Sequence, residues 1–149
     1  MKVNILILLF ISISLLSCDP FYFKVAIDDN GFEKSYHFEC GNIDVLCDAI
    51  GYKASIFLNF ELDFPILINP KKFEISHKNI PIKTSVRFND EFIEYKTIVN
   101  KGNQKIIIDI ENYKPHVGDT LIINADNFIL CNEKPLGIGD IKLVFVNRK

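Results

Sequence analysis

The sequence predicts an all-β protein, built as an antiparallel β-sandwich. After residue 20, apolar and polar residues alternate with a period of two in many short stretches, which is the pattern of strands with one buried face. Gly, Asn, Asp and Pro cluster between these stretches, where the chain must turn. The chain holds many such stretches, and short strands spaced by turns are typical of sandwiches and barrels.

The first two expected strands lie on either side of a tight turn. Aromatic and aliphatic residues alternate with polar ones over residues 21–27 and again over residues 35–40. Residues 28–31 read Asp-Asp-Asn-Gly, and the Asn-Gly pair favours the positive φ angles of a hairpin turn. We therefore expect a turn of this kind between the two strands.

Residues 42–51 depart from the alternation. The apolar residues at the helical spacing i, i+3, i+4 and i+7 are Ile43, Leu46, Cys47 and Ile50. Asn42 is a favourable N-terminal cap for a helix, and Gly51 is a favourable residue for its end. The sequence thus predicts one short amphipathic helix over residues 42–51.

Strand patterns resume after this expected helix. The further strands are expected over residues 54–62, 73–75, 82–88, 92–98, 106–110, 121–123, 128–131 and 141–146. Turn residues separate them, notably at residues 64–65, 89–90 and 100–103 and in the loop over residues 132–140. Residues 21–149 are therefore expected to form one domain, with no internal repeat.

Residues 113–121 connect two of the expected strands. Pro115 and Gly118 suit a loop that crosses from one sheet to the other. This connection resembles the inter-sheet loop of immunoglobulin-like and fibronectin-like domains, and the resemblance covers the C-terminal half of the chain. It implies an immunoglobulin-like sandwich, although the chain has no Trp and Leu121 stands where a fibronectin-like corner often has Tyr.

The first eighteen residues have the pattern of a secretory leader. Met1-Lys2 precedes an apolar run over residues 5–11, and Leu15-Leu16-Ser17-Cys18 follows. The apolar stretch is about fourteen residues long, whereas a membrane-spanning helix needs roughly 20. The four residues that end at Cys18 resemble the lipobox of bacterial lipoproteins, which implies cleavage before Cys18 and acylation of that cysteine.

This resemblance sets the expected organisation and location of the chain. Residues 1–17 would be the cleaved signal peptide, residues 18–20 a lipid-attachment linker, and residues 21–149 the sandwich domain. The lipids on Cys18 would hold the domain to a membrane of the bacterial cell envelope, by default facing the periplasm. Inner or outer membrane, and the leaflet, stay open.

Charge and composition exclude one class of partner. The formal net charge is −2, and basic and acidic residues are interspersed without long blocks. A nucleic-acid-binding domain would show a basic stripe, and the sequence has none. We expect the membrane and a protein to be the partners, and no nucleic acid.

Three cysteines remain after Cys18, an odd number for an oxidising compartment. Cys40 ends an expected strand and Cys47 lies on the expected helix, so a Cys40–Cys47 disulfide is the preferred pairing. A long-range bond from either residue to Cys131 is the rival, and the absence of any bond is the third possibility. Cys131 could instead be a small buried apolar residue.

The sequence offers no recognisable catalytic or metal site. His37-x-x-Cys40 lacks the tight paired spacing of zinc ligands, and His37 and Cys40 point to opposite faces of a regular strand. Ser76 and His77 are adjacent and cannot pair on an extended strand, and no Gly-x-Ser-x-Gly is present. We therefore predict no catalytic residues, no metal and no cofactor.

Apolar residues also occur on the expected outer side of the strands. Phe57, Ile107 and Ile122 would form a second apolar face. The alternative is that the expected helix or a crossing loop covers them. Left uncovered, this face would be a protein-contact patch.

These features predict a small lipid-anchored envelope protein that serves as a non-catalytic protein-binding or assembly module. An inhibitor or immunity lipoprotein, directed against a secreted toxin or hydrolase, is the first alternative. A domain that binds a small ligand, or an enzyme, is the second. Exposed strand edges or the second apolar face would make the contact with the partner.

Overall fold

A computed structural model describes residues 22–26, 35–50 and 53–147 of the chain. Its first eight strands are β1 (Tyr22–Ala26), β2 (Ser35–Phe38), β3 (Gly41–Ile50), β4 (Lys53–Leu62), β5 (Ile66–Ile68), β6 (Glu74–His77), β7 (Ile80–Pro81) and β8 (Thr84–Phe88). The others are β9 (Glu91–Phe92), β10 (Thr97–Val99), β11 (Gly102–Ile110), β12 (Thr120–Asn124), β13 (Ile129–Cys131), β14 (Lys134–Pro135) and β15 (Asp140–Asn147). A single 3-10 turn, η1 (Pro70–Lys72), is the helical element of these residues.

The strands form two antiparallel sheets. In the eleven-stranded sheet the order is β7-β6-β12-β15-β1-β3-β4-β11-β8-β9, with β2 paired to β3, and the four-stranded sheet has the order β10-β5-β13-β14. β1 pairs with β15 on one side and with β3 on the other, so it carries the large sheet from one layer to the other. We call the four-stranded sheet the small sheet.

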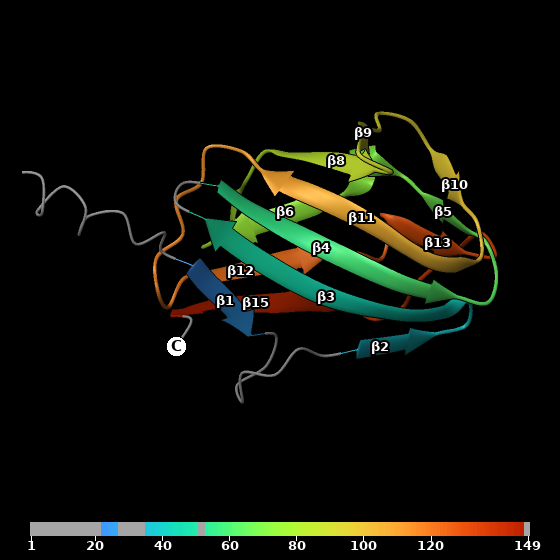
Figure 1. Cartoon of the computed structure of the whole chain (residues 1–149), viewed down its shortest axis with the longest axis horizontal. Coiled ribbons are helices and arrows are strands. Elements are labelled where there is room, and N and C mark those ends of the chain that lie inside the picture. The colour runs from blue at the N-terminus through green and yellow to red at the C-terminus, as the bar shows by residue number, and fades with distance from the viewer. Residues whose placement is uncertain (1–21, 27–34, 51–52, 148–149) are drawn as a thin grey trace, which may run out of the picture.

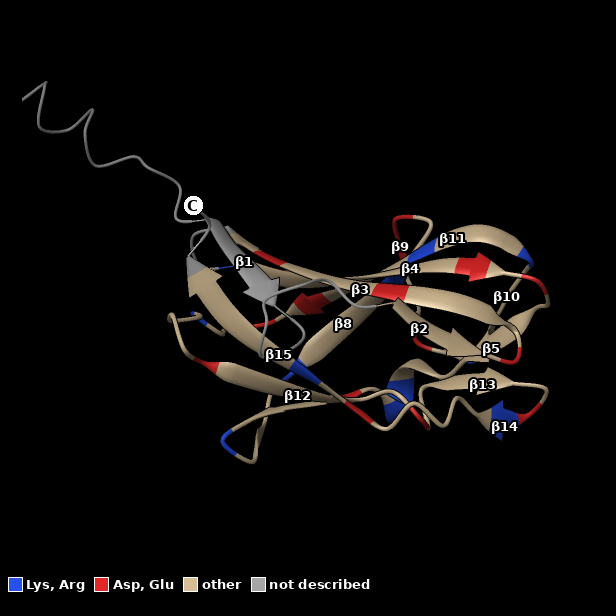
Figure 2. Ribbon diagram, turned by 90° about the horizontal axis from the view of Figure 1, so that it is seen from below, with Lys and Arg blue, Asp and Glu red and all other residues tan. Residues whose placement is uncertain are grey.

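The two layers are visible in Figures 1 and 2. The long strands β3, β4 and β11 make one layer. The opposite layer consists of β12 and β15 at one end and of β5, β13 and β14 at the other. The predicted all-β sandwich is therefore confirmed, while its immunoglobulin-like character stays a prediction.

The core lies between these layers and is apolar throughout the described residues. On β4 every second residue is buried, as the alternation of residues 54–62 predicts. Phe73 and Phe128 meet edge to face, with their ring centroids 4.9 Å apart. The largest fully buried side chains are Phe128, Phe145, Ile43, Ile56, Leu58, Ile66, Ile68, Ile106, Ile108, Leu121, Ile123 and Ile129.

The helix expected over residues 42–51 is wrong, because these residues form β3. β3 pairs with β4 along its whole length, from Gly41 opposite Leu62 to Ile50 opposite Lys53. The same segment also has a period of two: Ile43, Val45, Cys47 and Ala49 are buried and the residues between them are not. β-branched residues favour strands, and the ten-residue partner strand supplies the hydrogen bonds that an isolated short helix could not match.

Most other expected strands are present. The expected strand over residues 92–98 is wrong as one element, because β9 and β10 are two short strands in different sheets. The expected turn at residues 28–31 lies outside the described residues, and β1 and β2 both pair with β3 and not with each other. Asn89 and Asp90 have φ angles of 52° and 63°, which confirms the tight turn expected there.

The disulfide joins Cys40 to Cys131, so the preferred Cys40–Cys47 pairing is wrong and its rival is correct. β3 explains this outcome. Seven residues of strand would separate the Cα atoms of Cys40 and Cys47 by about 23 Å, far beyond the roughly 7 Å that a disulfide can bridge. Cys131 of the small sheet has its Cα 5.9 Å from that of Cys40. The bond therefore ties the small sheet to the β2–β3 turn.

Gly41 makes this close arrangement sterically possible. Its φ angle is 142°, and a Cβ atom at this position would lie 2.1 Å from the backbone oxygen of Glu61. Any other residue would push β3 away from the end of β4. Gly41 thus keeps the neighbouring Cys40 in position for its bond.

We predict that non-reducing peptide mapping will join the peptide of Cys40 to that of Cys131. The residues lie 91 positions apart, and closing a loop of this size lowers the entropy of the unfolded chain. Cys131→Ser should therefore lower the free energy of unfolding by about 4 kcal/mol. Urea denaturation measures this difference.

Cys47→Ala is the matched control for the free energy of unfolding. It removes a thiol that forms no disulfide, so it should lower this free energy by less than Cys131→Ser does. Cys47 is a buried free cysteine, and burial together with the nearby charge of Asp48 raises the pKa of its thiol. A thiol reagent should therefore modify Cys47 only after the protein unfolds. A peptide that links Cys40 to Cys47 would contradict the observed pairing.

Candidate functional site

The predicted contact patch is divided between two faces of the molecule. Phe57 of β4 and Ile107 of β11 are directly opposite each other, and Leu46 of β3 lies opposite Phe57 on its other side. All three are half-buried on the outer face of the long strands. Ile122 lies on β12, in the other layer of the sandwich, so it cannot extend this stripe.

Charged side chains surround the stripe of Leu46, Phe57 and Ile107. The Lys105 ammonium lies 4.5 Å from the centroid of the Phe57 ring. Arg87 lies opposite Ile107 and donates two hydrogen bonds to Asp109, at 2.6 and 3.0 Å. These bonds from Arg87 lower the pKa of Asp109, against the opposing effect of partial burial. The helix expected to cover Phe57 is a neighbouring strand, so it does not lie over the stripe.

The small sheet carries a second apolar row, which sequence reasoning missed. Leu67 lies opposite both Ile98 and Leu130, and Leu130 lies opposite Pro135, so one row crosses all four strands. The residues on either side of Leu67 are buried, so the row faces away from the core. Ile98 is 66% exposed. We call Leu67, Ile98, Leu130 and Pro135 the small-sheet row.

Two further features distinguish the small-sheet row from the stripe on the long strands: an unpaired sheet edge and exposed aromatic side chains nearby. In the described part of the chain, β10 and β14 each pair on one side only. β14 has two residues and contains Pro135, which has no backbone N–H to donate, so β10 is the edge that can accept another strand. Phe92 and Tyr95, in the segment that leads into β10, are about as exposed as Ile98. The Lys71 ammonium lies 5.2 Å from the centroid of the Tyr95 ring.

A polar groove of about 440 Å³ lies across β2, β3, β4 and β11. Ser35 donates a hydrogen bond to Asp44, and His37 pairs with Asn42, so these four lining groups already bond to each other. The remaining lining residues are Asn59, Phe60, Glu61, Asn103, Gln104 and Lys105.

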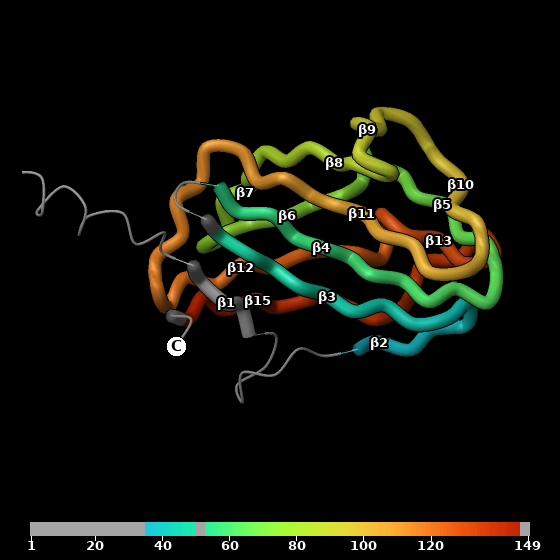
Figure 3. The backbone as a smooth tube through the Cα atoms, in the orientation of Figure 1, coloured from blue at the N-terminus to red at the C-terminus, as the bar shows by residue number. Residues whose placement is uncertain are grey.

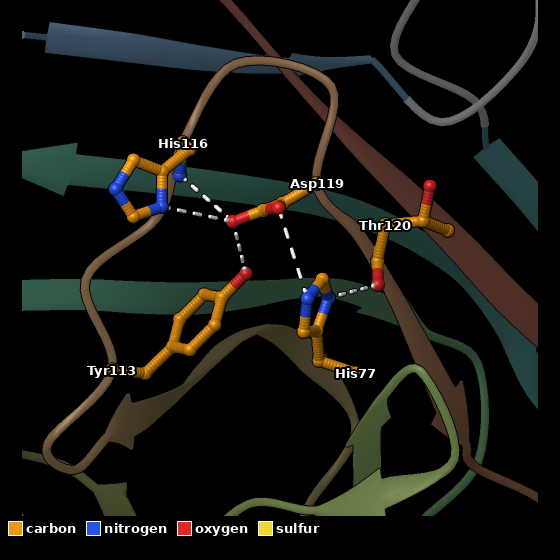
Figure 4. Close-up of polar contacts among 5 residues, drawn as sticks. All are labelled: His77, Tyr113, His116, Asp119 and Thr120. Carbon is orange, nitrogen blue, oxygen red and sulfur yellow. Dashed lines mark hydrogen bonds and ion pairs between the residues drawn. The ribbon is translucent and has the colours of Figure 1, made fainter.

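A polar cluster at the other end of the domain is centred on Asp119 (Figure 4). Tyr113 Oη and the backbone N–H of His116 each donate to Asp119 Oδ2, both at 2.9 Å. His77 Nε2 lies 3.7 Å from Asp119 Oδ1. His77 Nδ1 lies 3.0 Å from the backbone oxygen of Thr120 and carries the hydrogen, because that oxygen can only accept.

Electrostatics in the cluster favour an ionised Asp119 and a neutral Tyr113. Partial burial of Asp119 favours its protonated form, but the hydrogen bonds from His116 and Tyr113 and the nearby histidines outweigh it and lower the pKa of the carboxyl. Burial, and next the hydrogen bond to Asp119, raises the pKa of the Tyr113 hydroxyl. The two shifts are consistent with a Tyr113 that donates to a carboxylate.

The contacts of Asp119 hold the loop between β11 and β12. Its backbone oxygen accepts from the N–H of Phe145, and the N–H of Gly118 donates to the oxygen of Phe145, so the loop is bonded to β15. Thr120 supplies only its backbone oxygen to the cluster. The geometry therefore supports a structural role for these residues.

The sequence analysis also considered Cys18 and possible metal ligands. Cys18 lies outside the described residues. Within residues 22–26, 35–50 and 53–147, no group of three or more His, Cys, Asp and Glu side chains is placed to hold a metal ion. The cluster joins His77 of β6 to His116 of the loop before β12, and the Gly-Asp pair at residues 118–119 was its only local signal.

Among the described residues, no helix is long and apolar enough to cross a bilayer. No protein-family model, no curated protein and no solved structure matches the chain significantly.

We predict that Tyr113→Phe lowers the free energy of unfolding by about 1–2 kcal/mol at neutral pH, because it removes a hydrogen bond to a charged carboxylate. The pKa of Asp119 lies below that of an unfolded Asp, so its contribution is present above about pH 4 and is lost as the pH falls through the lowered pKa. The difference between variant and wild type should therefore shrink in acid. Urea denaturation across this pH range measures it.

Tyr95→Phe is the matched control, because Tyr95 is 73% exposed. Its loss of a hydroxyl should leave stability unchanged within about 0.5 kcal/mol. A Tyr113→Phe variant as stable as this control would show that the cluster does not hold the loop.

Proposed function

We propose that this protein is a lipid-anchored protein of the bacterial cell envelope that binds a protein partner and has no catalytic role. Acylated Cys18 attaches it to the membrane, by default on the periplasmic side. The small-sheet row makes the contact with the partner. The exposed apolar row on a sheet whose edge strand β10 is unpaired on its outer side is the observation that carries this proposal.

The sequence supports the lipid anchor. Leu15-Leu16-Ser17-Cys18 has the residue types of a lipobox, and it follows an apolar segment of signal-peptide length. Each acyl CH₂ that enters the bilayer contributes about 0.8 kcal/mol, and two or more chains give stable attachment. The acyl chains on Cys18 would meet this requirement without a spanning helix.

The shape of the small sheet supports a protein contact. Leu67 and Leu130 are half-buried and lie between the more exposed Ile98 and Pro135. An extended segment of a partner could add to β10 through backbone hydrogen bonds and cover the row with its own apolar side chains. The pairing of β5 with β10 and β13 makes the row continuous across the sheet.

The start of β1, which follows the proposed anchor in the sequence, and the small-sheet row lie at opposite ends of the domain. Figure 1 shows β1 beginning at one end, and β5, β10 and β13 at the other. The disulfide fixes the small sheet there, through Cys131. A partner could therefore reach the row without displacing the domain from the membrane.

We predict that a photo-crosslinking residue at Pro135 forms one defined adduct in the native cell, and that Ile98→Asp abolishes it. A charge at position 98, on the edge strand to which the partner would add, must be desolvated without an ion-pair partner, which weakens binding by about tenfold or more. Ile122→Asp is the matched control on the other sheet, where Ile122 is 36% exposed, and should leave the adduct intact. Immunoblotting measures the adduct.

The same cells test the anchor. Radiolabelled palmitate should enter the wild-type chain and not Cys18→Ser. An adduct that survives Ile98→Asp would exclude the small-sheet row as the contact, and a wild-type chain without palmitate would exclude the lipid anchor.

A further inference from the structure

A lipid on Cys18 would confine one end of the domain to the membrane surface. Only residues 19–21 separate Cys18 from Tyr22, where β1 begins. Four residue steps of fully extended chain span about 14 Å at most. The inference that follows rests on the proposed lipid anchor.

Strand register defines which parts of the chain share that end. Tyr22 lies opposite Ile50, which lies opposite Lys53, and Phe23 lies opposite Asn147. β11 ends at the same end, because Ile110 lies opposite Ala54. The connection from β11 to β12 then runs around this end, as the tube in Figure 3 shows.

Exposed basic side chains gather at this anchor end. Lys53 begins β4, Lys114 and His116 lie in the loop before β12, and Lys78 lies in the turn after β6. In the loop before β12, Val117 is 54% exposed. Arg148 and Lys149 follow Asn147 in the sequence.

Three of the acidic side chains at this end are already bonded to other groups. Glu111 forms an ion pair of 2.8 Å with Lys83, and Asp119 accepts hydrogen bonds from Tyr113 and His116. Asp48 is exposed and lies opposite Lys24 in the register of β1 and β3. Asp109, in the same register row as Asp48, is bonded to Arg87. The chain as a whole carries a formal charge of −2, so the exposed lysines of the anchor end are a local group of basic side chains.

We propose that the anchor end is a docking face for an anionic bilayer. The lysines lie against phosphate headgroups, and Val117 enters the interface at the tip of the loop. The Asp119 cluster holds this loop in place, so the domain stands upright on the membrane with the small-sheet row directed away from it. Each basic residue near such a surface favours the docked state by about fivefold.

The test uses the full chain, processed by a bacterial host and reconstituted through its own acyl chains. Vesicles contain equal parts of phosphatidylglycerol and phosphatidylcholine, or phosphatidylcholine alone. A fluorophore is attached at Val117→Cys or at Ile98→Cys, and quenching by spin-labelled lipid reports contact with the bilayer. The labelling is specific, because Cys40 and Cys131 form a disulfide and Cys47 is buried.

We expect strong quenching at position 117, more in the anionic vesicles, and little at position 98. Lys53→Glu with Lys78→Glu should lower the ratio of docked to undocked protein by about tenfold or more. Lys101→Glu with Lys134→Glu makes the same change of charge near the small sheet and should have no effect.

Equal quenching at both positions, or none at either, in a chain shown by mass to carry acyl groups would overturn the docking face and leave the lipid anchor standing. Equal effects of the two lysine pairs would overturn it as well. A chain that carries no acyl group would instead overturn the proposed anchor, and with it the premise of this inference.

Discussion

The inward row of apolar side chains on the three long strands is the constraint on which the structure depends. β3, β4 and β11 must cover two separate groups of strands, β12 and β15 at one end and the small sheet at the other. A strand turns successive side chains to opposite faces, so a slip of one residue in any long strand would expose its whole buried row. The ten-residue register of β3 against β4 therefore fixes the position of everything attached to them.

The two ends of the sandwich are held by different chemistry. At the small sheet, the bond between Cys40 and Cys131 adds a covalent link to three-residue strands that have little pairing energy of their own. At the anchor end, the carboxylate of Asp119 gathers Tyr113, His77 and the backbone of His116. Neither arrangement uses a buried charge, because every fully buried side chain among the described residues is apolar. Both proposed surfaces thus lie on segments that the core alone would hold weakly.

The period of two predicted the strands best where it was longest. Residues 54–62 alternate over nine positions and form β4 as expected, whereas residues 42–51 fit both a helix and a strand, and only the partner strand decides between them. The expected helix also led to the wrong disulfide pairing, because a helix would have brought Cys47 close to Cys40. The small-sheet row escaped prediction for another reason: strands of three residues show too few alternations, and their register appears only when the sheet forms. The cluster around Asp119 depends likewise on the pairing of β6 with β12, which no local pattern indicates.

The length of the long strands has a consequence for the partner. Ten residues of extended strand span about 33 Å, and β3 and β4 run from the anchor end to the small sheet. On a domain that stands upright on the membrane, the small-sheet row would lie about 30 Å from the headgroups. A partner buried within the bilayer could not reach it there. The proposed contact would therefore require either a soluble protein or a membrane protein with a projecting domain, and a partner strand would add to β10 far from the lipid surface.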